Sequence, residues 1–258
     1  LHLMDEIWVA TNFVAKAIRN VTSTPVHVVG NAVDVSQVEL VKRSELGISE
    51  DAFVVHFSFD ANSTVARKNP SGAIDAFLLA TEGDPSAVFL LKVRNFEQVR
   101  VSARLGNSHA RIFLEKVSKD PRIKLLTAEL DYPRALGLIQ LSDCYLSLHR
   151  SEGYGYGMAE ALALGVPVIA TGYSGNLDFM SNSSSKIVPY DSRPILPGEY
   201  FYWESEMHWA EPDVVVASEH LQTLISRGRR RHDVSEPDCR NSLEDLRRTY
   251  QKLLHQSA

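Results

Sequence analysis

Residues 151–180 read SEGYGYGMAEALALGVPVIATGYSGNLDFM, and this stretch decides how the rest of the chain is interpreted. The apolar run 144–148 precedes a glycine-rich segment, and strong helix formers follow over residues 158–164. The β-branched run 166–170 predicts a buried parallel strand. A glycine-rich turn at the carboxyl end of a strand, opening a helix, is where open α/β sheets bind nucleotides and phosphates.

Two glutamates, Glu152 and Glu160, lie in the glycine-rich loop and in the expected first turn of the helix. We therefore expect both to face one ligand from two sides. Carboxylates accept hydrogen bonds, and the adjacent hydroxyls of a sugar ring or a ribose donate them. The free N–H groups at the start of a helix suit a phosphate between the two. The stretch predicts a nucleotide-sugar site, whereas either glutamate alone would be better explained as a helix cap or a favourable charge at a helix start.

The spacing E-x7-E, followed by residues 161–171 (ALALGVPVIAT), resembles the retaining glycosyltransferases of family 4, which have the GT-B fold. The likeness extends to residues 58–76 (SFDANSTVARKNPSGAIDA), 171–179 (TGYSGNLDF) and 209–213 (WAEPD). It covers most of the chain from about residue 26 onward. The resemblance implies the carboxyl-terminal, donor-binding domain of such an enzyme, a Rossmann-like parallel sheet with helices on both faces.

The resemblance also assigns roles to individual residues. Glu152 is expected to hold sugar hydroxyls, Glu160 to hold the ribose hydroxyls, and the backbone at Thr127 to line the base pocket. Arg67 and Lys68 are expected to stabilise the diphosphate charge that grows as the sugar–phosphate bond breaks. The amides of the glycine-rich loop are expected to hold the sugar and the phosphate; these residues are Gly153, Tyr154, Gly155, Tyr156 and Gly157. The two tyrosine rings are expected to wedge this loop against the core.

The two basic residues follow a predicted buried strand at residues 53–59 (FVVHFSF). The loop after it delivers Arg67 and Lys68 beside the start of a helix that Asn69 caps and Pro70 opens. A solvated basic pair is the alternative to phosphate contact. The loop lacks the G-x-G-x-x-G pattern, so a dinucleotide cofactor is not expected. Cations and helix termini take the place of a metal, so neither a metal nor another cofactor is expected.

Strands alternate with helices along the chain, which predicts a parallel sheet covered on both faces. Further strands are expected at residues 5–10, 26–30, 87–93, 122–126 and 186–189. Further helices are expected at residues 11–20, 37–46, 96–105, 110–117, 131–141, 214–227 and 239–256. Residues 191–209 show no period and predict a long loop, with the next helix beginning at residues 209–212.

The expected domain organisation has three parts. Residues 1–35 are expected to be an interdomain segment or the end of a missing amino-terminal domain; a first strand–helix unit of the main domain is the alternative. Residues 36–235 are expected to form the donor-binding domain. Residues 236–258 are expected to form a helix that docks on the missing domain. On this interpretation the chain is part of a longer enzyme and is inactive alone.

Composition narrows the function classes. The chain has 258 residues, 44% hydrophobic and 23% charged, which suffices for one large α/β domain. The net charge of −5 implies no attraction to nucleic acid. Cys144 and Cys239 lie far apart and predict no metal site. No apolar run is long enough to span a bilayer and no signal peptide is visible, so a cytoplasmic location is expected, with peripheral membrane association for the longer protein.

These observations together predict a retaining glycosyltransferase that binds a nucleotide-diphospho-sugar donor, in polysaccharide or other glycan assembly. The acceptor, a glycan or a lipid-linked glycan, would bind through the missing amino-terminal domain. The alternatives are a nucleotide-sugar-binding module without turnover and another GT-B enzyme, such as an epimerase or a phosphorylase. The sequence names neither the base, the sugar nor the acceptor.

Overall fold

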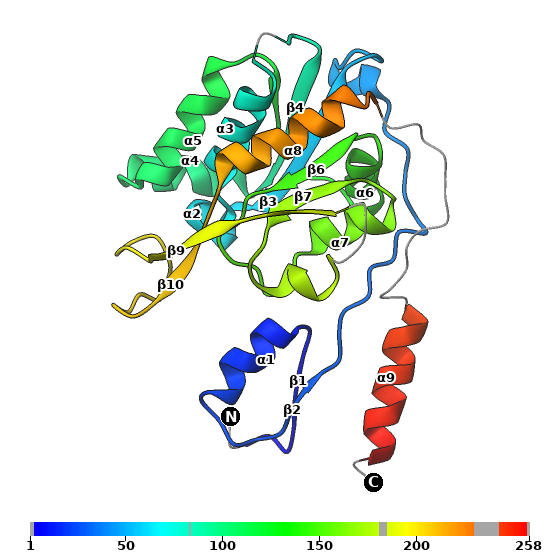
Figure 1. Cartoon of the computed structure of the whole chain (residues 1–258), viewed down its shortest axis with the longest axis vertical. Coiled ribbons are helices and arrows are strands. Elements are labelled where there is room, and N and C mark those ends of the chain that lie inside the picture. Colours follow the sequence, from blue (N-terminus) through cyan, green and yellow to red (C-terminus); the bar gives the residue numbers. More distant parts are fainter. Residues whose placement is uncertain (1–2, 83, 181–184, 230–242, 257–258) are drawn as a thin grey trace.

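The computed structural model describes residues 3–82, 84–180, 185–229 and 243–256 (Figure 1). Within them, a six-stranded sheet has the order β5-β4-β3-β6-β7-β8, and every neighbouring pair is parallel. Its strands are β3 (Phe53–Asp60), β4 (Ala87–Arg94), β5 (Ile123–Leu126), β6 (Cys144–Ser147), β7 (Val168–Thr171) and β8 (Ser185–Val188). The predicted parallel sheet is confirmed.

The strand order places a switch point in the middle of the sheet. From β3 the chain moves outward through β4 to β5, returns to β6 on the other side of β3, and moves outward again through β7 to β8. This is the Rossmann order, in which the connections after the two central strands leave in opposite directions. A crevice is expected at their carboxyl ends, between the segments that follow β3 and β6.

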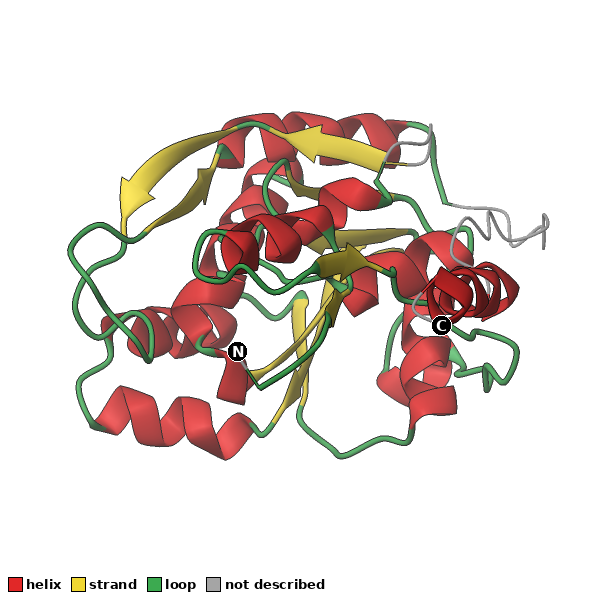
Figure 2. Cartoon of the chain, turned by 90° about the horizontal axis from the view of Figure 1, so that it is seen from below, coloured by secondary structure: helices red, strands yellow, loops and turns green. Residues whose placement is uncertain are grey.

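Helices cover both faces of the sheet (Figure 2). On one face α3 packs against α5 and α8, and on the other face α6 packs against α7 (Figure 1). The helices are α2 (Val65–Lys68), α3 (Pro70–Ala80), α4 (Phe96–Arg104), α5 (Ser108–Lys119), α6 (Tyr132–Gln140), α7 (Tyr156–Ala163) and α8 (Val214–Ser226). Phe57, Phe77 and Phe89 lie fully buried between these layers, so the core is the one that apolar strands predict.

Local capping chemistry sets several helix ends where the sequence predicts them. The Asn69 side chain accepts a hydrogen bond of 3.2 Å from the Gly72 N–H, and Pro70 follows at the first position of α3. Asp131 caps α6 in the same way, through the Arg134 N–H at 3.1 Å. These caps fix the point at which each loop at the top of the sheet turns back into a helix.

The helix predicted over residues 37–46 is wrong. Only a short 3-10 helix, η1 (Arg43–Leu46), forms there, and Gly47 ends it with φ 62°. The Glu39 N–H donates to the Pro133 carbonyl at 3.0 Å, so the backbone bonds to another element instead of to its own preceding turn. The buried Arg43 guanidinium bonds to Asp143 and to the Leu141 carbonyl, each at 3.0 Å, which ties the segment along α6.

The long loop predicted over residues 191–209 is also partly wrong. Its ends pair as an antiparallel hairpin of β9 (Tyr190–Pro194) and β10 (His208–Pro212). Residues 209–212 are therefore strand and not the start of a helix. Asp213 caps α8, accepting from the Val215 and Val216 N–H groups at 2.9 and 3.0 Å. The pairing joins residues that are 14 to 22 positions apart along the chain, which is beyond the short window in which strand or helix periodicity is read.

The amino-terminal segment forms a small unit with a hydrophobic core of its own. β1 (Ile7–Val9) pairs in parallel with β2 (Val26–Val28), apart from the six-stranded sheet, and α1 (Asn12–Arg19) covers them. The terminal helix α9 (Leu243–Gln256) lies beside this unit (Figure 1), where Tyr250 stacks on Trp8 with 5.3 Å between ring centroids. Residues 239–242 of the predicted helix lie outside the described residues. The domain boundaries after residues 35 and 235 stay predictions.

Each helix in the part of the chain that the structure describes is too short or too polar to cross a bilayer.

Candidate functional site

A cavity of about 280 Å³ opens at the switch point, at the carboxyl ends of β3 and β6. One wall is the glycine-rich loop and the start of α7, and another is the end of α2. The lining residues are Phe57, Ser58, Lys68, Tyr145, Ser147, Glu152, Tyr154, Gly155, Tyr156, Gly157 and Met158. The cavity therefore lies where the Rossmann order of strands predicts a ligand crevice.

An ion cluster centred on Glu152 fills one end of this cavity. Arg67 Nη1 lies 3.1 Å from Glu152 Oε2, and Lys68 Nζ donates to Oε1. The three side chains are largely buried, with 11–16% of their surface exposed. The sequence predicted that Arg67 and Lys68 lie in a loop, but they are the last two residues of the short helix α2. Two cations around one carboxylate leave a net charge of +1 at the site.

Electrostatics keep Glu152 ionised. Burial alone would raise its pKa, but the charges of Lys68 and Arg67 outweigh burial and lower the pKa of Glu152 to about 2. Burial lowers the pKa of Lys68, and the charge of Glu152 opposes that shift. At neutral pH the carboxylate can therefore act only as a hydrogen-bond acceptor.

Two neighbouring elements hold the backbone around Glu152. The Glu152 N–H donates to Ser174 Oγ at 2.8 Å, and the Gly175 N–H donates to the Glu152 carbonyl at 3.0 Å. Thr11, the cap of α1, donates its hydroxyl to the Gly153 carbonyl at 2.7 Å. The amino-terminal unit thus contacts the glycine-rich loop directly, and the loop is ordered from both sides.

Two of the loop glycines are required by geometry. Gly155, the residue before α7, has φ +100°, a conformation that side chains rarely adopt. A Cβ on Gly157 would lie 2.2 Å from the Tyr145 hydroxyl oxygen. The first turn of α7 is therefore pressed against β6. Its first N–H groups, which have no partner inside the helix, begin at the cavity wall that Tyr156 and Gly157 form.

The two tyrosines of the loop behave differently. Tyr154 is buried, its ring centroid lies 5.0 Å from that of Phe179, and its hydroxyl donates to the Asn31 carbonyl at 2.8 Å. The prediction that its ring wedges the loop against the core is confirmed. Tyr156 is 52% exposed, so the same prediction for its ring is wrong. As the first residue of α7, Tyr156 lies at the rim of the cavity.

Glu160 lies apart from the cluster of Glu152. Because α7 begins at Tyr156, Glu160 falls in the second turn and not in the first. Its Oε1 accepts a hydrogen bond of 3.1 Å from the Tyr132 hydroxyl, and burial raises its pKa. Glu160 does not line the cavity around Glu152. Tyr145 does line it, and burial together with the charges of both glutamates raises the pKa of Tyr145.

Thr127 follows β5, at the edge of the sheet, and its side chain is exposed. It does not line the cavity. The structure thus brings together Arg67, Lys68, Glu152 and the glycine-rich loop, and it places Glu160 and Thr127 outside this cavity.

Sequence reasoning missed three polar residues of the lining. Ser58 and Ser147 lie near the carboxyl ends of β3 and β6, and the Tyr145 hydroxyl is 3.0 Å from Ser58 Oγ. Polar residues at the ends of two otherwise apolar strands were the available signal. His149 is buried, and its Nε2 lies 3.2 Å from the Tyr173 carbonyl oxygen.

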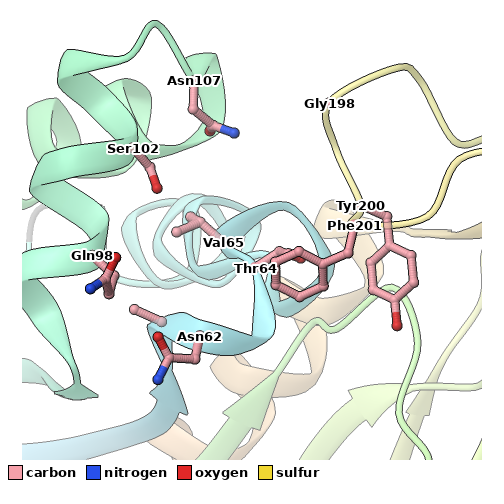
Figure 3. Close-up of a pocket in the computed structure, with 10 residues that line it drawn as sticks. Asn62, Thr64, Val65, Gln98, Ser102, Asn107, Gly198, Tyr200 and Phe201 are labelled. Carbon is pink, nitrogen blue, oxygen red and sulfur yellow. The ribbon is translucent and has the colours of Figure 1, made fainter.

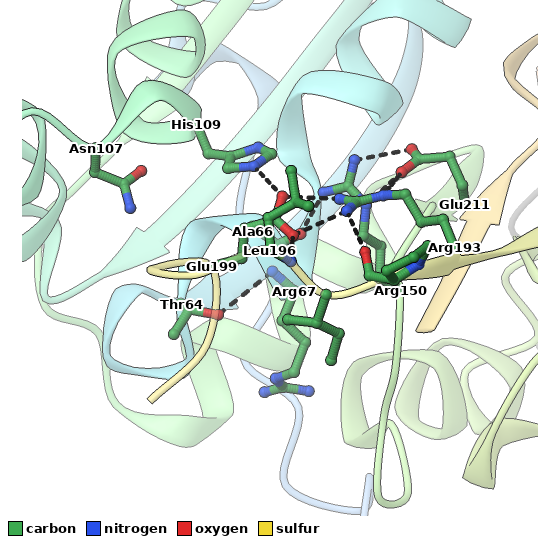
Figure 4. Close-up of polar contacts among 12 residues, drawn as sticks. Thr64, Ala66, Arg67, Asn107, His109, Arg150, Arg193, Leu196, Glu199 and Glu211 are labelled. Carbon is green, nitrogen blue, oxygen red and sulfur yellow. Dashed lines mark hydrogen bonds and ion pairs between the residues drawn. The ribbon is translucent and has the colours of Figure 1, made fainter. Parts of the chain in front are cut away.

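Arg150 connects the site to the β9–β10 hairpin (Figure 4). Its guanidinium forms two bonds of 2.8 Å to Glu211 of β10 and one of 2.5 Å to the Ala66 carbonyl of α2. Its backbone N–H donates to the Arg67 carbonyl at 2.8 Å. Arg150 therefore holds the short helix that carries both cations.

Among the described residues, no group of three or more His, Cys, Asp or Glu side chains is arranged to hold a metal ion.

Searches against protein-family models and against curated protein sequences found no match. Solved structures do match. The UDP-forming α,α-trehalose-phosphate synthase from Burkholderia xenovorans superposes with a TM-score of 0.65 at 12% identity, over 97% of this chain and 61% of that one. Sucrose-phosphate synthase from Thermosynechococcus elongatus gives 0.59 at 14% identity, over 98% and 58%.

WaaG, a glycosyltransferase involved in lipopolysaccharide biosynthesis, gives a TM-score of 0.57 at 13% identity, over 85% of this chain and 53% of that one. The chain thus spans between about half and three fifths of the length of these neighbours. At such identities the likeness concerns the fold. The chain has the Rossmann-like fold found in GT-B glycosyltransferases.

Proposed function

We propose that this chain is the donor-binding part of a retaining glycosyltransferase that uses a nucleotide-diphospho-sugar. The observation that carries the proposal is the cluster of Arg67, Lys68 and Glu152 at the switch point, beside a helix start that opens with glycines. Its net positive charge and the free N–H groups of α7 suit a diphosphate. The ionised carboxylate suits the hydroxyls of a sugar.

Each residue has a distinct part in the proposed reaction. Glu152 accepts hydrogen bonds from the sugar, and the Gly153–Gly157 backbone contacts the sugar and the phosphate. Lys68 and Arg67 stabilise the negative charge that develops on the diphosphate as the bond to the sugar breaks. Removing one preorganised donor of this kind typically costs about 2.7–4 kcal/mol of transition-state stabilisation. Glu160 accepts hydrogen bonds from the ribose, either beside the bond that it accepts from the Tyr132 hydroxyl or in place of that bond.

Several finer statements belong to the same proposal. Retention of the anomeric configuration follows from the resemblance of residues 152–171 to glycosyltransferase family 4. UDP is the first nucleotide to test, because one structural neighbour is described as UDP-forming. Thr127 is proposed to contact the base through its backbone. No metal or other cofactor is proposed for the transfer. The acceptor, a glycan or lipid-linked glycan, is proposed to bind outside the described residues, in a domain of a longer protein.

Calorimetry with UDP and with UDP-glucose tests the proposal. Glu160→Ala should weaken the binding of both ligands, whereas Glu152→Ala should weaken only the preference for the intact sugar donor. Glu129→Ala removes a carboxylate that is 68% exposed and serves as the matched control. Absence of UDP binding by the wild-type chain, or equal losses for both ligands in both site variants, would count against the assignment.

A further inference from the structure

A second pocket, of about 260 Å³, lies at the start of α2 (Figure 3). Lys68, at the end of this helix, lines the first cavity, whereas Thr64 and Val65, at its start, line the second. The remaining lining residues come from η2 (Ala61–Ser63), from α4 and the Asn107 cap of α5, and from the hairpin loop: Ala61, Asn62, Gln98, Ser102, Asn107, Gly198, Tyr200 and Phe201. The volume is near the lower end for small-molecule sites, about 300 Å³.

The lining of this pocket is neutral and polar on one side. None of its ten residues carries a charge. The side chains of Asn62 and Gln98 form no hydrogen bond to other described residues, and Asn107 uses only its oxygen, which accepts from the Ala110 N–H at 2.9 Å. Amides offer donors and acceptors together, which suits ligand hydroxyls, and the absence of a cation in the lining does not suit a phosphate.

The opposite side of the pocket is aromatic. The ring of Phe201 reaches from the hairpin loop over Thr64, and Tyr200 stands beside it (Figure 3). Phe201 is 70% exposed, although an aromatic ring gains free energy by burial. The face of an aromatic ring carries partial negative charge and attracts the polarised C–H groups of a flat apolar surface, such as one face of a pyranose.

The loop that carries these rings is anchored by polar contacts. The buried Glu199 carboxylate pairs with Arg193 at 2.8 and 2.9 Å, with His109 at 2.7 Å, and with the Leu196 N–H at 2.8 Å (Figure 4). The Trp203 indole donates to the Ile195 carbonyl at 2.6 Å. A preordered loop loses little conformational entropy when a ligand binds.

The backbone is strained at the same place. Thr64, which also lines the pocket, has φ 63° and ψ 132°, an unusual conformation for a β-branched residue. Such strain is commonly retained where it positions a functional surface.

From the neutral amides, the exposed ring and the fixed loop, we propose that this pocket binds one neutral sugar residue of a glycan. The site is distinct from the donor cavity, and the proposal does not rest on the proposed function, because it concerns binding alone. A sugar held here lies one short helix away from Lys68, so a glycan bound in the pocket would run beside the candidate donor site.

Saturation-transfer NMR on the whole chain tests this site with maltotriose, cellotriose and chitotriose, and with uridine as a flat aromatic competitor. At least one trisaccharide should bind, and Phe201→Ala and Gln98→Leu should each weaken it about tenfold, the effect of one lost contact. Tyr202→Ala is the matched control, since Tyr202 is 81% exposed and does not line the pocket. Thermal unfolding of each variant verifies folding.

Three results would overturn the proposal. They are absence of binding by all three trisaccharides, equal binding by the wild-type chain and both pocket variants, and binding of uridine alone that Phe201→Ala abolishes. UDP binding, measured in the same samples, reports on the donor cavity separately, so either proposal can fail without the other.

Discussion

Arg67 Nη1 lies 3.1 Å from Glu152 Oε2, although 85 residues separate the two along the chain. The contact joins the segment after β3 to the segment after β6, the two strands that flank the switch point. Lys68 bonds to the other carboxylate oxygen, so both oxygens of Glu152 are engaged. A ligand with two phosphates would therefore enter a site whose cations are already ordered by a carboxylate.

Glu152→Gln should destabilise the chain and leave a vacancy that an anion can fill. Removing one partner from a largely buried ion cluster leaves the others uncompensated, so we expect the free energy of unfolding to fall by about 2–3 kcal/mol. UDP at saturation should restore more stability to this variant than to the wild-type chain. Urea unfolding with and without UDP measures both effects, and Glu129→Gln, at an exposed carboxylate, should change neither.

Acid should remove the stabilisation that Glu152 provides. Its pKa is depressed from 4.5 to about 2 in the folded chain, so the contribution is complete above pH 4.5 and is lost as pH falls toward 2. By pH 3.5 a part of it on the order of 1 kcal/mol should be gone. Urea unfolding at pH 5.5 and pH 3.5 should therefore show a smaller difference between wild type and Glu152→Gln at the lower pH. A difference independent of pH would contradict the assignment of a depressed pKa.

Gly157→Ala should disturb the start of α7. The added Cβ would lie 2.2 Å from the Tyr145 hydroxyl, so the ring or the helix must move, at a cost of about 1–3 kcal/mol. UDP affinity should fall with it. Tyr145→Phe in the same chain should recover part of the loss, because it removes the nearest atom. Gly153→Ala is the control, since its Cβ would meet only Val14 at 3.8 Å. Equal unfolding free energies for the two alanine variants would refute this explanation.

Arg150→Lys should weaken UDP binding in the candidate site, although Arg150 does not line its cavity. Lysine loses the two-pronged bond to Glu211 and the bond to the Ala66 carbonyl, so α2 is no longer held from the hairpin. We expect about 2 kcal/mol less stability and severalfold weaker UDP binding by calorimetry. Arg134→Lys, at a side chain that is 42% exposed, is the control. Unchanged UDP affinity in Arg150→Lys would show that α2 is positioned by other contacts.

The fold was predictable because its signals are local. The apolar strands and the caps at Asn69 and Asp131 are properties of short segments, and they are observed where predicted. The predicted helix at residues 37–46 and the predicted loop at 191–209 failed for one shared reason. In both places the backbone bonds to another segment and not within its own turn, through Glu39 to Pro133 in the first and across the β9–β10 hairpin in the second.

The sequence by itself determined the parallel α/β architecture, the glycine-rich turn and the identity of the charged residues around it. Only the tertiary structure decided how those charges meet. The sequence pattern predicted that Arg67 and Lys68 contact a phosphate, whereas in the folded chain both form ion pairs with Glu152. It also predicted that Glu160 lies beside Glu152, whereas α7 begins two residues earlier than predicted, so Glu160 falls in its second turn and outside the cavity that Glu152 lines. Spacing along a chain fixes which residues share a loop or a helix turn, but contacts between loops depend on the order and register of the strands that carry them.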